Sequence, residues 1–497
     1  MDDPFNIFDA QPPKKSRVEQ VAGPESSLLP LVRAFVVQNA RRTSEDLLPQ
    51  LAGSASSGAA ASGAAPTSVA DDLESLVALL QMESPKERAD SIAPATRIEA
   101  ATWSLLSQRG AWPHVAWREA YVLSQWVLSY TDAVRNAPTD ALRRLDRAFI
   151  LGGPSEMLRN AMAVMEAAID TPATHATPLD AVIDTQPSEQ VSSEKVSSEK
   201  VSSEKVSPGN AIGSTISTID PARQIERAAH LTLDAFRPHW RANRPLVLGG
   251  LLDDWGAVSK WSLDWFRAVH GHRLVPVELG LMGGSTSRGK PPPAAAFGGK
   301  PPAAAAFGGK PPPAAASSET PSWHERTMAL SDLIDTYLLP SARGDSAGIA
   351  YLAQHALFEQ IPSLREDFQP PPHCELGRLQ HVNVWMGTAG TVTPLHYDSY
   401  DNMLAQLSGY KYVRLYASDQ SRYLYVERAA ADGGLSAQGN MSSVEELEAP
   451  DLERYPLLGK ARYTETVLGP GETLFIPARC WHYVRSLSSA LSVSFWF

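Results

Sequence analysis

The sequence predicts an α+β protein with two folded parts, an all-helical N-terminal part and a C-terminal jelly roll. Between residues 25 and 170, apolar residues recur at the three- and four-residue steps of a helix. From about residue 380 onward, short β-rich runs alternate with Gly, Pro or Ser. A Ser- and Glu-rich repeat separates the two parts and offers too little apolar surface to fold.

The composition argues against a nucleic-acid-binding protein, a disulfide-rich protein and a membrane protein. The formal net charge is -11 over 497 residues, so the surface is not broadly basic and we expect no direct binding of nucleic acid. Cys374 and Cys480 are the only cysteines, which excludes a disulfide framework and a four-cysteine zinc site and favours a reducing compartment. The acidic N-terminus lacks a signal-peptide core, and no apolar run reaches the roughly 18 residues of a membrane span. We therefore expect an intracellular protein with no membrane partner.

Four segments follow from the composition along the chain. Residues 1–24 form a disordered tail with a basic cluster at Pro12–Arg17, which nuclear import machinery could bind. A solvated charge run is an equally good interpretation, so the expected location is the nucleus, the cytoplasm or both. Residues 25–170 form the helical domain, in which four tryptophans are expected in the core: Trp103, Trp112, Trp117 and Trp126. Residues 171–219 form a disordered linker with three copies of Val-Ser-Ser-Glu-Lys.

The C-terminal domain spans residues 220–497 and carries a low-complexity insertion at 289–316. The prolines of that insertion remove backbone donors, so we expect an exposed excursion within the domain. The predicted strands are His381–Trp385, Asn402–Leu407, Tyr412–Tyr416, Glu472–Ile476 and Leu491–Phe497. The last of these alternates apolar residues with Ser492, Ser494 and Trp496, which predicts one buried face. Such short strands favour a double-sheet jelly roll or a barrel.

The candidate chemistry lies in two motifs that each present a histidine. His396-Tyr397-Asp398 places an imidazole and a carboxylate on one face if the segment is extended. A lone His-x-Asp is expected by chance in a chain of this composition. Here the context is a G-x5-H-x-D-x3-N-x6-G segment that ends at Gly409. Far downstream, a G-x5-P-x4-H segment runs from Gly471 to His482. A double-stranded β-helix of the cupin type brings ligands together from strands spaced in this way.

These motifs resemble the JmjC (Jumonji C) subfamily of Fe(II)- and 2-oxoglutarate-dependent oxygenases. The resemblance covers residues 220–497 and is closest to the small-chain protein arginine hydroxylases, first described as lysine demethylases, which also have a helical N-terminal domain. The segments that carry it are Asn383–Gly387, Thr393–His396, Lys411–Tyr416 and Ser492–Trp496. The resemblance implies Fe(II) as cofactor and 2-oxoglutarate and O2 as co-substrates.

The predicted metal ligands are His396, Asp398 and His482. Two imidazoles and one carboxylate on one face of an octahedral ion leave three positions for the co-substrates. A structural zinc would instead favour four protein ligands, usually thiolates. The alternative for the two histidines is that they are hydrogen-bonded residues of the core.

The resemblance also implies which residues bind 2-oxoglutarate and which bind the substrate side chain. For 2-oxoglutarate it implies that Lys411 binds the distal carboxylate, with Tyr351 and Thr393 as hydrogen-bond donors, and that Asn402 orients the carboxylate near the metal. Without the resemblance, Lys411 would be taken for a surface lysine and Tyr351 for a core residue.

For the substrate, the resemblance implies Glu278, Trp323 and Trp385 as the residues that hold a guanidinium. A carboxylate pairs with that group in a bidentate manner and an aromatic face stacks on it. The alternatives are a rim carboxylate and core aromatics. The insertion 289–316 lies between Glu278 and Trp323 and departs from the family pattern.

Three functions remain open at this point. The first is hydroxylation of a protein side chain, arginine in particular, with decarboxylation of 2-oxoglutarate to succinate. The second is demethylation of N-methyl-lysine, because hydroxylation of an N-methyl group releases formaldehyde. The third, from another class, is a catalytically silent module that only binds peptides. Intact residues at all four positions His396, Asp398, His482 and Lys411 argue against silence.

Overall fold

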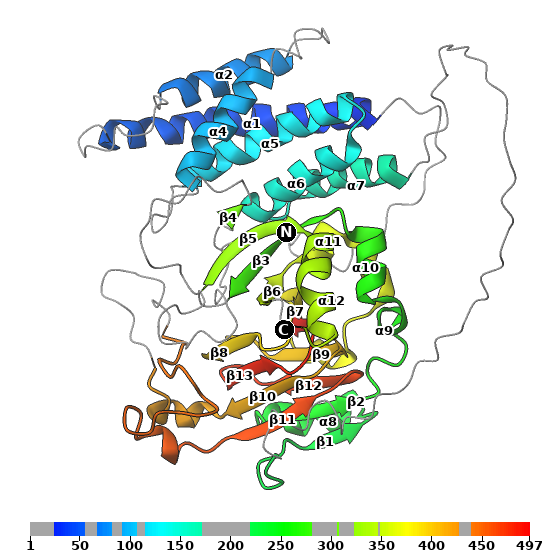
Figure 1. Cartoon of the computed structure of the whole chain (residues 1–497), viewed down its shortest axis with the longest axis vertical. Helices are drawn as coiled ribbons and strands as arrows, with labels where there is room; N and C mark the ends of the chain where they lie inside the picture. The colour runs from blue at the N-terminus through cyan, green and yellow to red at the C-terminus, as the bar shows by residue number, and fades with distance from the viewer. Residues whose placement is uncertain are drawn as a thin grey trace, which may run out of the picture. The chain divides into compact units, whose positions relative to one another are not determined.

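The computed structural model divides into two units, residues 1–170 and residues 171–497, which are described separately (Figure 1). The residues that the structure describes are 24–54, 67–81, 92–106, 115–170, 219–280, 306–307, 323–345, 348–426 and 439–497. The basic cluster Pro12–Arg17 and the repeats of the linker lie outside these ranges.

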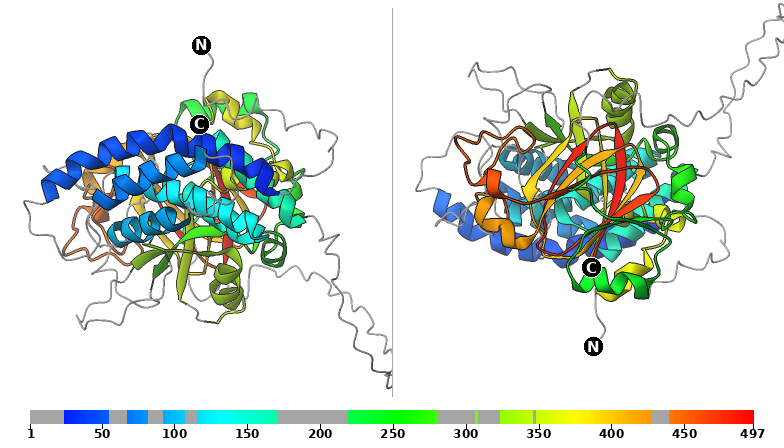
Figure 2. Two further views of the ribbon diagram at one scale, coloured as in Figure 1. Left: turned by 90° about the horizontal axis from the view of Figure 1, so that it is seen from above. Right: turned by 90° about the horizontal axis from the view of Figure 1, so that it is seen from below.

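The described part of the first unit is helical. Its helices are α1 (Pro24–Ser54), α2 (Thr67–Gln81), α4 (Ile92–Leu106), α5 (Val115–Val134), α6 (Pro138–Gly152) and α7 (Glu156–Asp170). Helix α5 packs against α1, α4 and α6, and nearly all of its residues from Ala120 onward are buried. Figure 2 shows α1 and the following helices side by side.

The predicted tryptophan core is only partly confirmed. Trp126 is fully buried and stacks on Phe35 with ring centroids 4.5 Å apart. Trp103 of α4 and Trp117 of α5 are only half-buried, and Trp112 is outside the described residues. The stacked pair therefore anchors α1 to α5.

The second unit is built on two sheets. The ten-stranded sheet has the order β1-β2-β12-β9-β14-β7-β6-β3-β5-β4, and the four-stranded sheet has the order β11-β10-β13-β8. The strands are β1 (Arg227–Ala229), β2 (Leu246–Gly249), β3 (Leu274–Gly280), β4 (Ala306–Phe307), β5 (Trp323–Ala329), β6 (Ile349–His355), β7 (His381–Gly387), β8 (Val392–His396), β9 (Asn402–Ser408), β10 (Lys411–Tyr416), β11 (Thr464–Leu468), β12 (Glu472–Ile476), β13 (Trp481–Ser486) and β14 (Ala490–Trp496). Strands distant in sequence, such as β9, β12 and β14, therefore lie side by side (Figure 2).

Short helices accompany the sheets. They are α8 (Leu233–Arg241), α9 (Gly256–Lys260), α10 (Leu263–His270), α11 (Leu330–Leu333), α12 (Leu339–Ala342) and α13 (Leu357–Gln360), with a π-helix at Ile334–Leu338 and 3-10 turns at Pro362–Asp367, Pro372–Leu376, Ser418–Tyr423 and Leu458–Lys460. Among the helices within the described ranges, none has the length and apolar character needed to cross a membrane. Helices and mostly antiparallel sheets together confirm the predicted α+β class.

Three apolar layers hold the second unit together. The helices cover the outer face of the large sheet, where Phe236, Val277 and Phe495 are buried. The inner faces of the two sheets meet around Tyr351, Trp385, Val413 and similar residues. A third cluster, which includes Trp481, covers the outer face of the small sheet. The inner layer also contains the polar side chains of the predicted site, among them His396, His482 and Lys411.

The prediction of one buried face for the last strand is wrong. All residues of β14 are buried, since the strand is central in the large sheet with β9 on one side and β7 on the other. Its second face points into the inner layer, where the Ser492 hydroxyl donates to the Gln406 side chain and the Trp385 indole donates to the Ser494 hydroxyl. The serines mark a polar interior face and not a solvent face.

The low-complexity insertion 289–316 contributes one short element. Ala306–Phe307 forms β4, which runs parallel to β5 at Arg326–Thr327. The rest of the insertion lies outside the described residues, so its exposure stays a prediction.

Candidate active site

The two histidines of the predicted metal site come from neighbouring strands of the small sheet. His396 ends β8, His482 is near the start of β13, and the two are paired across the strands. The register then shifts, so that Val484 pairs with Thr393. Between these two pairs, the single residue Tyr483 of β13 opposes the two residues Pro394 and Leu395 of β8, which is the geometry of a β-bulge. The bulge places Thr393 on the same inner face as His396, although their spacing of three would separate them in a regular strand.

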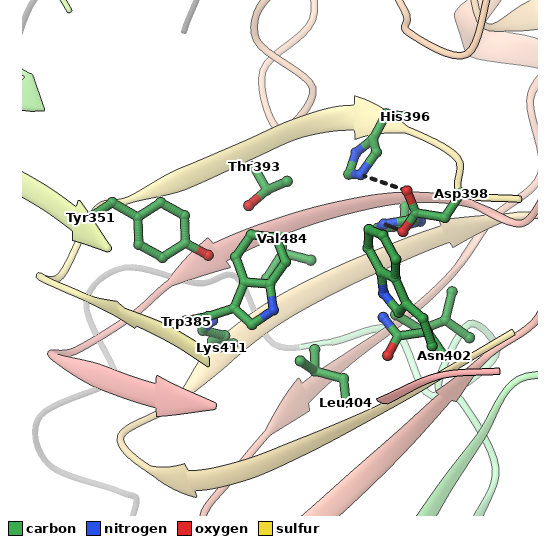
Figure 3. Close-up of a pocket in the computed structure, with 12 residues that line it drawn as sticks. Tyr351, Trp385, Thr393, His396, Asp398, Asn402, Leu404, Lys411 and Val484 are labelled. Atoms are coloured by element: carbon green, nitrogen blue, oxygen red, sulfur yellow. Dashed lines mark ion pairs between the residues drawn. The ribbon is translucent and has the colours of Figure 1, made fainter. Parts of the chain in front are cut away.

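Asp398 reaches the same point from the loop after β8. Strand β8 ends at His396, so the side chains of His396 and Asp398 do not lie on one face of a single strand. The carboxylate nevertheless lies 3.7 Å from His396 Nε2 and 3.6 Å from His482 Nε2 (Figure 3). Ligand atoms of the three residues all lie within 4.8 Å of one another.

Backbone carbonyls fix the orientation of both imidazoles. His396 Nδ1 donates to the Pro394 carbonyl at 2.8 Å, and His482 Nδ1 donates to the Cys480 carbonyl at 3.0 Å. A carbonyl can only accept, so the proton of each neutral ring sits on Nδ1 and the Nε2 lone pair is free. Burial and the neighbouring His396 lower the pKa of His482 to about 4, which keeps this ring neutral at pH 7. The three side chains fit a divalent metal ion that accepts two neutral imidazoles and one carboxylate.

Lys411 lies deep in the inner layer, 2% exposed, at the start of β10. Gly409 sets this position, since its φ of +71° closes the turn from β9 and an added Cβ would meet the Ser489 carbonyl oxygen at 2.0 Å. Among the described residues no carboxylate pairs with the ammonium, whose aromatic neighbour is Tyr351 at 5.7 Å. Burial lowers the pKa of Lys411 to about 7. A buried ammonium group without a carboxylate partner favours the binding of an anionic ligand at this position.

The hydroxyl and amide groups predicted for the co-substrate share this pocket. Tyr351, Thr393 and Asn402 line it together with the metal-site residues and Lys411 (Figure 3). Tyr351 hydrogen-bonds to Thr393, and burial raises its pKa. Gly387 makes room for the tyrosine, because a Cβ there would lie 2.6 Å from the ring. The Asn402 Oδ1 atom is buried without a hydrogen-bond partner in the described structure. An oxygen left alone in this way is typical of a ligand site.

Aromatic and apolar side chains form the remaining wall. Trp385 stands on β7, its indole N–H fixed by Ser494 at 2.9 Å and its ring 5.9 Å from that of Tyr351. Sequence reasoning missed four lining residues: Leu404, Ile476, Val484 and Trp496. The position of Trp496 could have been predicted from the sequence, because the two-residue period of a strand places it on the same face of β14 as Ser492 and Ser494.

Two carboxylates face each other beside this pocket. Glu278 on β3 is in register with Tyr351 on one side and with Glu325 of β5 on the other. Both acids are half-buried, and burial raises the pKa of Glu278 to about 7 and that of Glu325 to about 8, with the Glu278 charge adding to the second shift. Glu325 was not among the predicted residues. Trp323 begins β5 in register with Gly280, and nothing more is described of its side chain.

Comparison with known proteins agrees with this geometry. The family described as cupin-like domain matches residues 232–497. JmjC domain-containing protein F of Dictyostelium discoideum is 35% identical over 424 residues, which cover 80% of this chain and 85% of that protein. The chain belongs to the JmjC family. As a JmjC protein, it is a 2-oxoglutarate-dependent oxygenase.

Other JmjC relatives differ in the activity that their names state. Lysine-specific demethylase 8 of Xenopus tropicalis is 35% identical over 288 residues, or 57% of this chain and 54% of that protein. The human bifunctional peptidase and (3S)-lysyl hydroxylase JMJD7 is 28% identical over 275 residues, or 51% of this chain and 77% of that protein. The chain thus spans only about half the length of the demethylase. Both names describe action on protein, and they disagree on the reaction.

Proposed function

We propose that this JmjC protein is an Fe(II)-dependent hydroxylase of a protein side chain, with arginine as the residue modified. The observation that carries the choice of arginine is the pair Glu278 and Glu325. Two carboxylates in register on adjacent antiparallel strands have Cβ atoms roughly 5 Å apart and repel each other when both are ionised. A guanidinium, with five donors in a planar fork, would satisfy both.

The metal would be held by His396, Asp398 and His482. When bound, Fe(II) supplies the activation of O2 that is coupled to decarboxylation of 2-oxoglutarate. The chain's own residues bind and orient the reactants. Lys411 neutralises the distal carboxylate of 2-oxoglutarate, and Tyr351 and Thr393 provide hydrogen bonds to it. Asn402 orients the carboxylate near the metal by donating a hydrogen bond from its amide N–H group.

The substrate side chain would enter along the inner faces of β3, β6 and β7. Glu278 lies beside Tyr351 on this path, and the fixed indole of Trp385 provides an apolar face further along. Trp496 also lines the pocket. In this position the arginine guanidinium would pair its charge with a carboxylate and stack its flat face on an aromatic ring. These contacts would hold the aliphatic carbons of the arginine side chain near the metal.

The second candidate is demethylation of N-methyl-lysine. Relatives named lysine-specific demethylase favour it, including JMJ30 of Arabidopsis thaliana, 32% identical over 281 residues. A dimethylammonium has a single N–H donor, so it can pair with one of the two glutamates and leaves the other carboxylate unpaired. The glutamate pair therefore supports arginine over methyl-lysine.

Mass spectrometry distinguishes the two reactions. One peptide is prepared with arginine, lysine or dimethyl-lysine at the same position and incubated with the protein, Fe(II) and 2-oxoglutarate. We expect a gain of about 16 Da on arginine and no loss of 14 Da from dimethyl-lysine. Formaldehyde release from dimethyl-lysine without a product on arginine would reverse the choice. The proposed location stays the nucleus, the cytoplasm or both.

A further inference from the structure

Asp401 lies between the predicted metal ligand Asp398 and the predicted co-substrate residue Asn402, and its carboxylate binds two distant segments. One oxygen accepts the Ala478 backbone N–H at 2.7 Å. The other accepts the Trp240 indole N–H of α8 at 2.8 Å. Both oxygens are thus engaged by neutral donors, and the side chain ties α8 to the turn that precedes β13.

The Asp401 backbone is also engaged. Its N–H donates to the Phe497 carbonyl at 3.2 Å, and its carbonyl accepts from the Phe497 N–H at 3.0 Å. This two-way pairing holds the segment that follows β14 and therefore the neighbouring pocket residue Trp496. Asp401 meets three separate segments around the metal site.

The turn held by Asp401 carries unusual backbone geometry. Arg479, the residue after Ala478, has a φ of +61°, which is uncommon for a residue other than glycine. Its N–H donates to the Asp398 carbonyl at 2.8 Å. The next residue, Cys480, offers the carbonyl that accepts from His482 Nδ1. A turn in this conformation persists only when surrounding contacts hold it.

We propose that Asp401 is a positioning residue for the metal site, which acts through the turn Pro477–Cys480 on the imidazole of His482. The hydrogen bond to Ala478 holds the turn, the turn presents the Cys480 carbonyl, and that carbonyl directs His482 Nε2 toward His396 and Asp398. The inference rests on the metal assignment made under the proposed function and is independent of the substrate. It predicts that a change at Asp401 weakens metal binding without removing a ligand.

The test is a titration of the full-length protein with Co(II), followed by its visible absorption, with Asp401→Asn as the main variant. The amide can accept only one of the two N–H groups and must turn its own donor toward the other. We expect Co(II) affinity to fall about tenfold or more, with an altered spectrum, as is typical when a partner of a metal ligand is changed. Asp401→Glu, which keeps both acceptor oxygens, should recover part of the affinity.

A control variant separates positioning from general loss of stability. Ser262 caps α10, where its hydroxyl accepts from the Trp265 N–H at 3.1 Å, and it is not part of the pocket. Ser262→Ala should lower Tm and leave Co(II) affinity unchanged. If Asp401→Asn lowers Tm in the same way with wild-type Co(II) affinity and spectrum, Asp401 is only a structural tie and the proposal is wrong.

Two further outcomes remain decisive. If Asp401→Asn does not fold, Trp240→Phe is measured instead, because it removes one hydrogen bond from the carboxylate and keeps an aromatic ring on α8. A roughly threefold weaker Co(II) affinity is then expected, and unchanged affinity overturns the proposal. Failure of the wild-type protein to bind Co(II) would overturn the metal assignment itself, which is a different result from equal binding by wild type and variant.

Discussion

The imidazole rings of His396 and His482 lie with their centroids 4.1 Å apart and their planes inclined by 56°. Nothing in strand pairing alone requires two polar rings to meet in a buried layer. Their Nδ1 atoms are both turned away to backbone carbonyls, so the two Nε2 atoms remain for one shared partner. The Asp398 carboxylate completes that set.

Substitution His396→Ala should abolish metal-dependent turnover of 2-oxoglutarate while the protein stays folded. The side chain is a predicted ligand and contributes little apolar burial, so Tm should fall by only a few degrees. Succinate formation and thermal unfolding are the two measurements. Full turnover by His396→Ala would remove this residue from the metal site.

Substitution Lys411→Met should stabilise the protein lacking 2-oxoglutarate, and the gain should depend on pH. The pKa of Lys411 is about 7 in the folded state, against about 10.4 in the unfolded chain. The unfolded chain binds more protons between these values, so stability of the wild type rises with pH there, and burial of the ammonium costs most below pH 7. The gain should be on the order of 4 kcal/mol at pH 6 and much smaller at pH 10.

Urea unfolding at the two pH values measures that difference. The same variant should lose affinity for 2-oxoglutarate in a calorimetric titration, because the buried carboxylate loses its counter-charge. Wild-type affinity should also weaken as pH rises above 7. A variant with unchanged co-substrate affinity would show that Lys411 has another role.

The glutamate pair predicts pH-dependent binding of an arginine peptide. With pKa values of about 7 for Glu278 and about 8 for Glu325, both raised by burial, the pair holds protons at pH 6 that a guanidinium must displace. Peptide affinity should therefore increase between pH 6 and pH 8, with proton release visible by calorimetry in buffers of different ionisation enthalpy. Affinity that is flat or falls over this interval would contradict the role of the pair.

Substitution Glu325→Gln should weaken arginine-peptide binding about tenfold by removal of one charged acceptor, with uncoupled decarboxylation of 2-oxoglutarate preserved. Glu453→Gln is a matched control, because it makes the same change of charge at an exposed position outside the pocket. Equal effects of the two substitutions would indicate general electrostatics and not a specific contact.

Substitution Gly387→Ala should weaken 2-oxoglutarate binding and leave Co(II) binding intact. The new methyl group would meet the Tyr351 ring at 2.6 Å and the Thr391 side chain at 3.1 Å, so the tyrosine has to move. Parallel titrations with 2-oxoglutarate and Co(II) measure the two effects. Loss of Co(II) binding would mean that the displacement extends through the pocket.

Five strands of the described structure, β7, β9, β10, β12 and β14, could be predicted from the sequence with good accuracy because turn residues delimit them, whereas β8 and β13, which carry His396 and His482, were not predicted. Glu472–Ile476 has the predicted bounds, and the other four predicted strands differ at their ends by one or two residues. The two motifs also predicted which residues would meet at His396, Asp398 and His482. The roles assigned to these and to the guest-binding residues stay predictions.

Three other features of the site depend on pairing between distant strands, which the alternation of apolar and polar residues within one strand does not predict. The bulge in β8 changes which residues share a face, and Pro394 is the residue type that indicates it, because proline within a sheet is confined to edge strands, first positions and bulges. The inner face of β14 was taken for a solvent face because serine is common in both places. Glu325 depends on the register between β3 and β5, which lie on opposite sides of the insertion 289–316.

The burial of Cys480 bears on the chemical durability of the protein. Its carbonyl orients His482, and its thiol donates to the Tyr416 carbonyl at 3.4 Å. Burial raises the pKa of this thiol to about 12, so only about one molecule in 100,000 carries the thiolate at pH 7. The thiolate is the form that attacks peroxide, so burial keeps a cysteine two positions from a predicted metal ligand in its less reactive form. We therefore expect Cys480 to react slowly with alkylating reagents and with peroxide in the folded protein.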